Sequence, residues 1–231
     1  MRNGLRGAGA WLIGIGMVFG LAANASADII VLDFEGLGNI DFIGEFYNGG
    51  TSGSGNGPGP DFDISFSASA LSVIDADAGG SGNFGGEPSP STILFFLSGG
   101  AATMNVPAGF DTGFSFFYSA ISQPGQVRVY DGLDGTGNLL TTLDLPLTPF
   151  NGAPDPTGQF SPFLPFGVAF QGVARSVDFS GVANQIGFDD ITLGSETPGG
   201  TGNPVIPEPG TMLLMGMGTL AAGWGNRKRV I

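Results

Sequence analysis

Carboxylates are the only side chains in most of this chain that could carry acid–base or metal chemistry. The 231 residues include no His and no Cys, which excludes imidazole catalysis, thiol nucleophiles, disulfides and zinc sites built on these residues. The one Lys, Lys228, lies close to the C-terminus, so Ser-Lys and Schiff-base mechanisms are excluded for the rest of the chain. What remains is a set of 20 acidic residues.

Two acidic pairs lie far apart in the sequence, toward the two ends. Asp33 and Glu35 stand in DFEG, and Asp189 and Asp190 stand in GFDDITLG. The first and last strands of an antiparallel sandwich are often neighbours, which would bring the pairs together. Carboxylates gathered without basic residues repel one another unless a cation joins them, and Ca²⁺ prefers oxygen ligands. We therefore predict a structural calcium site at these four residues; alternatively, Asp33 and Asp189 are simply turn or outward-facing strand positions.

A carboxylate pair could also hydrolyse glycosidic bonds, at separations of ~5 Å in retaining enzymes and ~6.5–9.5 Å in inverting enzymes. Such clefts are usually lined with Trp, but Trp11 and Trp224, the only Trp residues, lie in the terminal segments. We therefore expect that the protein is not an enzyme, and a glycoside hydrolase is the least favoured alternative. For sugar binding, Tyr47 beside the turn Asn48-Gly49-Gly50 is the best candidate for an exposed contact.

The N-terminal segment has the pattern of a secretory signal. Arg2 and Arg6 precede an apolar run over residues 10–23, and the small residues Ala25 and Ala27 follow it. This run is short for a membrane span, and the small residues suit signal peptidase. We predict that residues 1–27 form a signal helix that is cleaved after export by the Sec route.

The C-terminal segment combines three features in order. Pro207, Glu208 and Pro209 precede an uncharged stretch over residues 210–226, and the basic cluster Arg227, Lys228 and Arg229 follows. As a helix, this stretch would be about 25 Å long, slightly short of a ~30 Å hydrocarbon core. The basic cluster would stay on the cytoplasmic side, so residues 207–231 are expected to form a single apolar helix that anchors the body outside.

Together these three features resemble the PEP-CTERM sorting signal of Gram-negative bacteria that make extracellular polysaccharide. The resemblance implies processing by an exosortase-type membrane enzyme near Pro207-Glu208-Pro209. It also implies transient anchoring in the inner membrane, followed by a place at the cell surface or outside the cell, in exopolysaccharide or biofilm. An ordinary tail anchor is the alternative.

The region between the terminal segments has the period of β-structure. A content of 43 Gly and 16 Pro excludes a helical bundle, and apolar and polar residues alternate in short runs. We predict an all-β, antiparallel two-sheet sandwich of the jelly-roll type over residues 28–194, with a closed barrel as the lesser alternative. The predicted strands cover residues 29–34, 62–70, 92–97, 102–106, 114–120, 126–130, 139–145, 168–170, 176–179 and 185–193.

Three stretches lack a strand pattern. Residues 48–60 are rich in Gly and Ser and predict a flexible surface loop. Residues 146–165 are rich in Pro and Phe, and so long a connection should either pack its Phe rings across a sheet or form a binding rim. Residues 195–206 predict a Gly/Pro-rich linker to the sorting segment.

The net charge of the exported part limits the kinds of molecule that it can bind. Residues 28–226 hold two basic and 20 acidic residues, for a net charge of −18. Such a surface repels nucleic acid and anionic headgroups, so we expect no nucleic-acid partner. Divalent cations and neutral molecules are favoured instead.

The two acidic pairs carry a second, local resemblance. DFEG and FDDI look like the elements that hold a structural calcium ion in jelly-roll carbohydrate-binding modules, and the likeness covers a few residues at each end. We therefore expect an exported, non-catalytic protein of the cell surface or extracellular matrix, associated with polysaccharide. A calcium-stabilised, lectin-like carbohydrate-binding module is the alternative.

Overall fold

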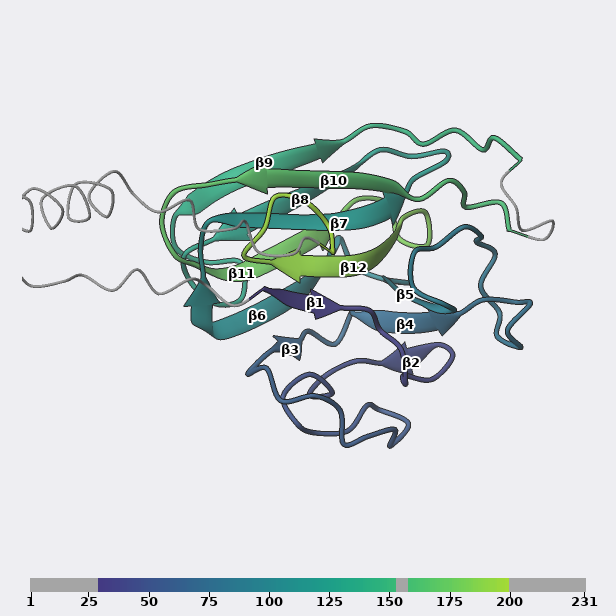
Figure 1. Cartoon of the computed structure of the whole chain (residues 1–231), viewed down its shortest axis with the longest axis horizontal. Coiled ribbons are helices and arrows are strands. Elements are labelled where there is room, and N and C mark those ends of the chain that lie inside the picture. Colours follow the sequence, from purple (N-terminus) through teal and green to yellow (C-terminus); the bar gives the residue numbers. More distant parts are fainter. Residues whose placement is uncertain (1–28, 153–157, 200–231) are drawn as a thin grey trace, which may run out of the picture.

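The computed structural model describes residues 29–152 and 158–199, which form two antiparallel β-sheets and no helix (Figure 1). This confirms the predicted all-β class with two sheets. Within these ranges no helix has the length and apolarity needed to cross a membrane. The predicted signal helix, the cleavage site at Ala25 and Ala27, and the apolar helix of the sorting segment lie outside the described residues.

One sheet has seven strands and the other has five. In spatial order, the seven-stranded sheet contains β10 (Leu164–Ala169), β7 (Gly113–Ser119), β12 (Gly187–Leu193), β5 (Thr92–Phe95), β4 (Leu71–Ile74) and β2 (Asp41–Phe42), with β1 (Ile30–Leu32) also paired to β12. The five-stranded sheet contains β3 (Ser65–Phe66), β6 (Ala101–Phe110), β11 (Ala174–Ser180), β8 (Gly125–Tyr130) and β9 (Leu139–Leu145).

The main core lies between the two sheets and is rich in aromatic rings. Phe116 on β7 and Phe188 on β12 have ring centroids 5.5 Å apart, and Phe179 on β11 approaches Phe188 to 4.9 Å. All three side chains are fully buried. Since the rings come from both sheets, they join the two layers as the predicted sandwich requires.

The outer faces of the two sheets differ. The five-stranded sheet carries polar residues outward, such as Asp178, whose cross-strand neighbours are Thr103 and Arg128. In the seven-stranded sheet, all four residues of β5 are buried, because loops cover the outer face as well. A second apolar cluster forms there from Val73, Phe84, Ile93, Phe95 and Phe163.

The predicted strand bounds hold best where apolar and polar residues alternate on a sheet with one wet face. The prediction for residues 139–145 matches β9. Of residues 62–70, only Ser65–Phe66 form a strand, β3, because Asp63 adopts a positive φ of 55° and the Ile64 amide donates to Tyr47 O instead of a ladder partner. The short strands β2 and β4 were not predicted.

The Gly-rich segment 48–60 is organised around a buried carboxylate. Asp41 is 1% exposed and accepts hydrogen bonds from Ser52 Oγ at 2.5 Å, the Ser54 amide at 2.8 Å and Asn56 Nδ2 at 2.9 Å. These hydrogen bonds tie the segment to Asp41 at the start of β2. The segment is a surface loop without a strand, as predicted, and its flexibility stays a prediction. The local composition did not reveal its attachment to Asp41, a carboxylate earlier in the chain.

The first residues of the predicted linker lie against the seven-stranded sheet. Ser115 Oγ donates to Ser195 O at 2.8 Å, and the Gly199 amide donates to Thr192 Oγ1 at 2.9 Å. A Cβ atom added to Gly167 would stand 2.1 Å from Glu196 O. Glycine on β10 thus allows the chain to pass closely over the sheet.

Candidate functional site

The two predicted acidic pairs lie at a junction of three segments. β1 pairs with the second half of β12, with Leu32 opposite Ile191, while the first half of β12 faces β5 through Phe188 and Leu94 (Figure 1). The register against β7 shifts between Asp189 and Thr192, which marks a bulge. The predicted proximity of the first and last strands is therefore confirmed.

Asp189 lies inside this junction and is fully buried. Its carboxyl oxygens accept hydrogen bonds from the Ser89 amide at 3.0 Å and the Asp190 amide at 2.8 Å. Ser89 Oγ lies 2.8 Å from both oxygens and 3.0 Å from Asp33 O. Asp189 therefore links β12 to the segment before β5 and, through Ser89, to the end of β1.

Burial raises the pKa of Asp189 to about 8, although hydrogen bonds from Ser89 partly oppose the shift. The proton also suits the geometry. A protonated Asp189 can donate to Ser89 Oγ, which leaves the one Ser89 hydroxyl hydrogen to bond to Asp33 O. The raised pKa favours the protonated form of Asp189, and the carboxyl group joins three segments of the structure.

Glu35 makes a second link between the same segments. Its Oε1 accepts from the amides of Ser91 at 2.9 Å and Thr92 at 2.8 Å, and its Oε2 lies 3.2 Å from Ser91 Oγ. These amides stand at the start of β5. Glu35 therefore ties the turn after β1 to the beginning of the neighbouring strand.

Asp33 and Asp190 complete the predicted set. Burial raises the pKa of Asp190, and the nearby Asp33 charge raises it further. However, the described ranges contain no group of three or more acidic side chains placed to hold a metal ion. Protein donors already bond to Glu35 and Asp189, so this arrangement does not fit a calcium cage, and the calcium site stays a prediction that the geometry does not favour.

Tyr47 is not an exposed contact, so this prediction is wrong. The residue is 1% exposed, and its hydroxyl accepts a hydrogen bond from the Phe34 amide at 2.7 Å. Its ring packs against Phe46 with centroids 5.2 Å apart. Burial, followed by the charge of Asp33, raises its pKa well above the usual value for tyrosine. The turn beside Tyr47 is exposed, but the ring points into the core.

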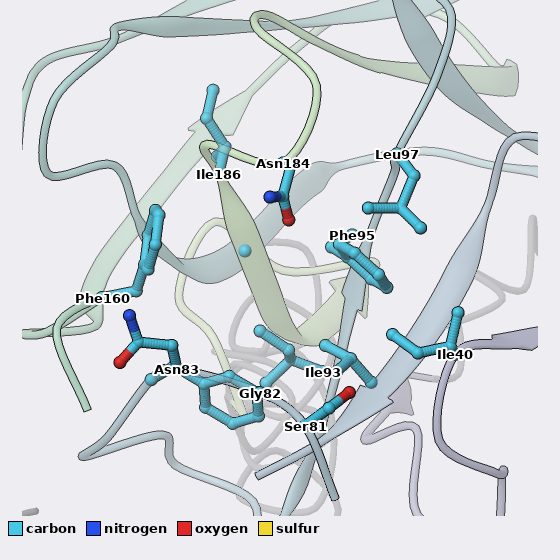
Figure 2. Close-up of a pocket in the computed structure, with 13 residues that line it drawn as sticks. Ile40, Ser81, Gly82, Asn83, Ile93, Phe95, Leu97, Phe160, Asn184 and Ile186 are labelled. Carbon is cyan, nitrogen blue, oxygen red and sulfur yellow. The ribbon is translucent and has the colours of Figure 1, made fainter. Parts of the chain in front are cut away.

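A pocket of about 220 Å³ lies on the outer face of the seven-stranded sheet (Figure 2). Its floor includes Ile93 and Phe95 of β5, and its wall includes Phe160 from the Pro-rich connection. That connection was predicted either to pack its rings across a sheet or to form a rim. Phe163 does the first in the second apolar cluster and Phe160 lines the pocket.

The polar groups of the pocket are all neutral. Ser81, Asn83 and Asn184 stand around it, and Figure 2 shows the Asn184 amide directed between Phe160 and Phe95. Within residues 29–152 and 158–199, no Asp, Glu, Lys or Arg lines it. Sequence reasoning missed this site, although the unbroken apolar run ILFFL over residues 93–97 signalled a strand covered on both faces.

Known proteins resemble separate parts of the chain. A carbohydrate-binding module (CBM6cm-2) from Cellvibrio mixtus lichenase 5A, solved with cellotriose, has 11% identity and a TM-score of 0.30, covering 55% of this chain and 86% of the module. The K1 and K3 cleaved adhesin domains of Lys-gingipain from Porphyromonas gingivalis each have 16% identity. Their TM-scores are 0.34 and 0.32, and the matches cover 56% and 73% of this chain and 96% and 93% of those domains. A search of curated proteins found no match.

The family comparison concerns the C-terminal segment. The model of the PEP-CTERM protein-sorting motif matches residues 205–229, a range that contains the predicted signal residues Pro207, Glu208, Pro209, Arg227, Lys228 and Arg229. The chain therefore carries a PEP-CTERM sorting motif after its β-sandwich body, and this motif implies export and sorting to the cell surface.

Proposed function

We propose that this chain is a non-catalytic protein of the cell surface or extracellular matrix that binds the extracellular polysaccharide of the cell that makes it. The observation that carries the proposal is the sorting motif at residues 205–229. It follows a body of residues 28–194 joined through the linker 195–206. Export by the Sec route and processing by an exosortase-type enzyme belong to the same proposal.

The state of the acidic residues supports a non-catalytic role. A general acid must reach the atom it protonates, but Asp189, the acid with a pKa of about 8, is fully buried. Glu35 and Asp41 are engaged by backbone and side-chain donors that hold loops in place. These three carboxylates therefore act as structural groups.

The charge distribution supports a neutral polymer as the partner. The exported part has a net charge of −18, which disfavours anionic ligands at long range. The described residues that line the pocket on the outer face, in contrast, are all neutral. A calcium-stabilised carbohydrate-binding module remains the alternative, and it differs in requiring an ion at the junction of β1 and β12.

Sorting is tested by changing the tail of the full chain in the producing cell. Replacing Pro207, Glu208 and Pro209 with Ala should prevent processing, so the variant should stay in the membrane fraction with Arg229 intact. The wild-type protein should reach the cell surface or medium without Arg227-Lys228-Arg229. A matched control with Ala at Pro198, outside the motif, should behave as the wild type; surface delivery of the motif variant would contradict the proposal.

Binding is tested with the purified full chain and the polysaccharide of the producing cell. We expect retention of the protein on the immobilised polymer and no shortening of the polymer chains. Shortening that disappears after one Asp or Glu substitution would instead establish a carboxylate-dependent hydrolase. Loss of retention in the presence of a calcium chelator would favour the calcium-stabilised alternative.

A further inference from the structure

The pocket on the outer face of the seven-stranded sheet combines apolar walls with neutral hydrogen-bonding groups. Its members come from six separate parts of the chain and include Ile40, Asn83, Phe95, Phe160 and Asn184. We propose that this pocket binds one neutral pyranose ring of a polysaccharide. The inference rests on the proposed function and deepens it, since it names the site and the class of sugar.

The neutrality of the pocket selects against charged sugars. None of the acidic residues that the structure describes lines the pocket, and neither Arg128 nor Arg175, the only basic residues of the body, lies there. A uronate or sulfated sugar would lose hydration on entering and would gain no counter-charge. The negative charge of the surrounding domain would also repel it.

The floor and walls suit the apolar face of a sugar ring. Phe95 is 6% exposed and packs with Ile93 in the second apolar cluster, so the floor is a packed apolar surface. Phe160 is partly buried and faces the pocket from the opposite side (Figure 2). The C–H groups on one face of a pyranose can lie on such a surface while the ring hydroxyls point away from it.

The rim supplies partners for those hydroxyls. Asn83 Oδ1 accepts from the Gln159 amide at 3.1 Å, which orients the side chain and leaves its NH₂ group to donate. In the described part of the chain, the Asn184 carboxamide has no hydrogen-bond partner, and its backbone is held at a φ of 59° by the Asn184 amide donating to Phe96 O at 2.7 Å. Both Asn residues are exposed and line the pocket, so their side-chain NH₂ groups are available to a ligand there.

The size of the pocket sets the size of the ligand. Its volume of about 220 Å³ is below the usual range of ~300–1,000 Å³ for sites that enclose drug-sized ligands. One sugar ring matches it better than a longer oligosaccharide. Ile40 and Leu97 at the mouth are 43% and 46% exposed, and they can contact the next sugar of a bound polymer.

The test uses saturation-transfer NMR on the full chain with methyl glycosides of glucose, galactose, mannose, rhamnose and glucuronic acid as probes. We expect saturation transfer to at least one neutral glycoside, with a Kd on the order of 1 mM, and none to the glucuronide. Asn184→Gly removes the side-chain amide. Since Gly adopts the positive φ of this position freely, the variant should fold normally, and its binding should be weaker by at least about fivefold.

The matched control is Asp63→Gly, which makes the same kind of change at an exposed residue with a φ of 55° outside the pocket. This variant should bind like the wild type. Phe160→Leu should also weaken binding, because it removes the aromatic wall. Equal binding by wild type and Asn184→Gly, equal binding of the glucuronide, or no binding of any neutral glycoside would each overturn the inference.

This result is separable from the proposed function. If the immobilised polysaccharide retains the protein while every methyl glycoside fails, the pocket assignment is wrong and the proposed function stands. If a neutral glycoside binds through Asn184 while the polymer is not retained, the pocket assignment stands and the proposed polysaccharide partner is wrong.

Discussion

Two buried carboxylates in this domain are stabilised in opposite protonation states. At Asp189, the cost of burial exceeds the effect of the hydrogen bonds from Ser89, and the pKa rises to about 8. At Asp41, burial also raises the pKa, but hydrogen bonds from Ser52, Asn56 and Ser54 together outweigh it and lower the pKa to about 2. The balance between the cost of burial and the hydrogen bonds to the carboxylate decides which form each site favours.

The Asp189 pKa predicts a stability that falls with rising pH. Between about pH 4 and pH 8, the unfolded chain loses this proton while the folded protein keeps it, so the free energy of unfolding decreases. The Asp189→Asn variant cannot ionise at this position, so its free energy of unfolding should decrease less than that of the wild type as the pH rises through this window. At pH 5 the substitution should lower the free energy of unfolding by about 1 kcal/mol, because one hydrogen-bond acceptor is lost.

Urea unfolding at pH 5, pH 7 and pH 9 measures this difference. Asp189→Ala is the companion variant and should cost about 2–3 kcal/mol, since the Ser89 and Asp190 amides lose their acceptors. If wild type and Asp189→Asn show the same pH dependence, Asp189 is already ionised in the folded state.

Asp41 predicts the reverse dependence, in a more acidic window. Its folded pKa of about 2 lies below that of the unfolded chain, so its contribution is present above about pH 4 and is lost as the pH falls toward 2. Asp41→Ala should lower the free energy of unfolding at pH 7 by about 1–3 kcal/mol, because it leaves the buried Ser52 hydroxyl and the part-buried Ser54 and Asn56 donors without their acceptor.

The same variant should speed hydrogen exchange at the Ser54 and Asn56 amides, which the Asp41 network holds. Asp77→Ala, at an exposed acidic residue, is the control and should leave both the stability and the exchange unchanged. Unchanged exchange in Asp41→Ala would mean that the Gly-rich segment is held by other contacts.

At the scale of elements, β12 is the organising strand of the seven-stranded sheet. One edge of β12 pairs with β7 along both halves. The other edge pairs with β5 before the bulge near Asp190 and with β1 after it. Glu35 and Asp189 close the junction where this change of partner interrupts the ladder. The alternating pattern predicted β12 correctly, but the bulge could not be predicted because it depends on the partners.

The segment after β12 should be held by its close approach to β10. In Gly167→Ala the added Cβ would overlap Glu196 O and Ser115 Cβ, so the segment must move or the strand must shift. We expect a loss of about 1–3 kcal/mol and faster cleavage after Glu196 by a glutamate-specific protease. Gly100→Ala, where a Cβ meets nothing within 4 Å, is the control and should resist cleavage like the wild type.

At the scale of the whole molecule, the two sheets have different roles. The five-stranded sheet presents a wet outer face, whereas loops cover the seven-stranded sheet and create the second apolar cluster and the pocket. The candidate binding site thus lies on the layer that also receives the start of the linker at Ser195. The pocket and residues 195–199, which follow β12, therefore belong to the same sheet.

Calcium should have no effect on the melting temperature of the full chain. At the junction of β1 and β12, protein groups already donate hydrogen bonds to Glu35 and Asp189. These two carboxylates should therefore keep their partners when a chelator removes calcium. Thermal unfolding in calcium and in chelator measures this. A higher melting temperature in calcium that disappears in Asp190→Asn would contradict the prediction and establish the ion site.

The sequence by itself determined the excluded chemistry, the sorting motif and the all-β class. These follow from composition, from a short motif and from alternation between neighbouring residues, which are local properties of the chain. Only the tertiary structure decided that Tyr47 is buried, that Asp189 bonds to Ser89 and that Phe160 meets Asn184 across a pocket. Burial and hydrogen-bond donors in those cases come from segments far apart in the sequence, so no local pattern records them.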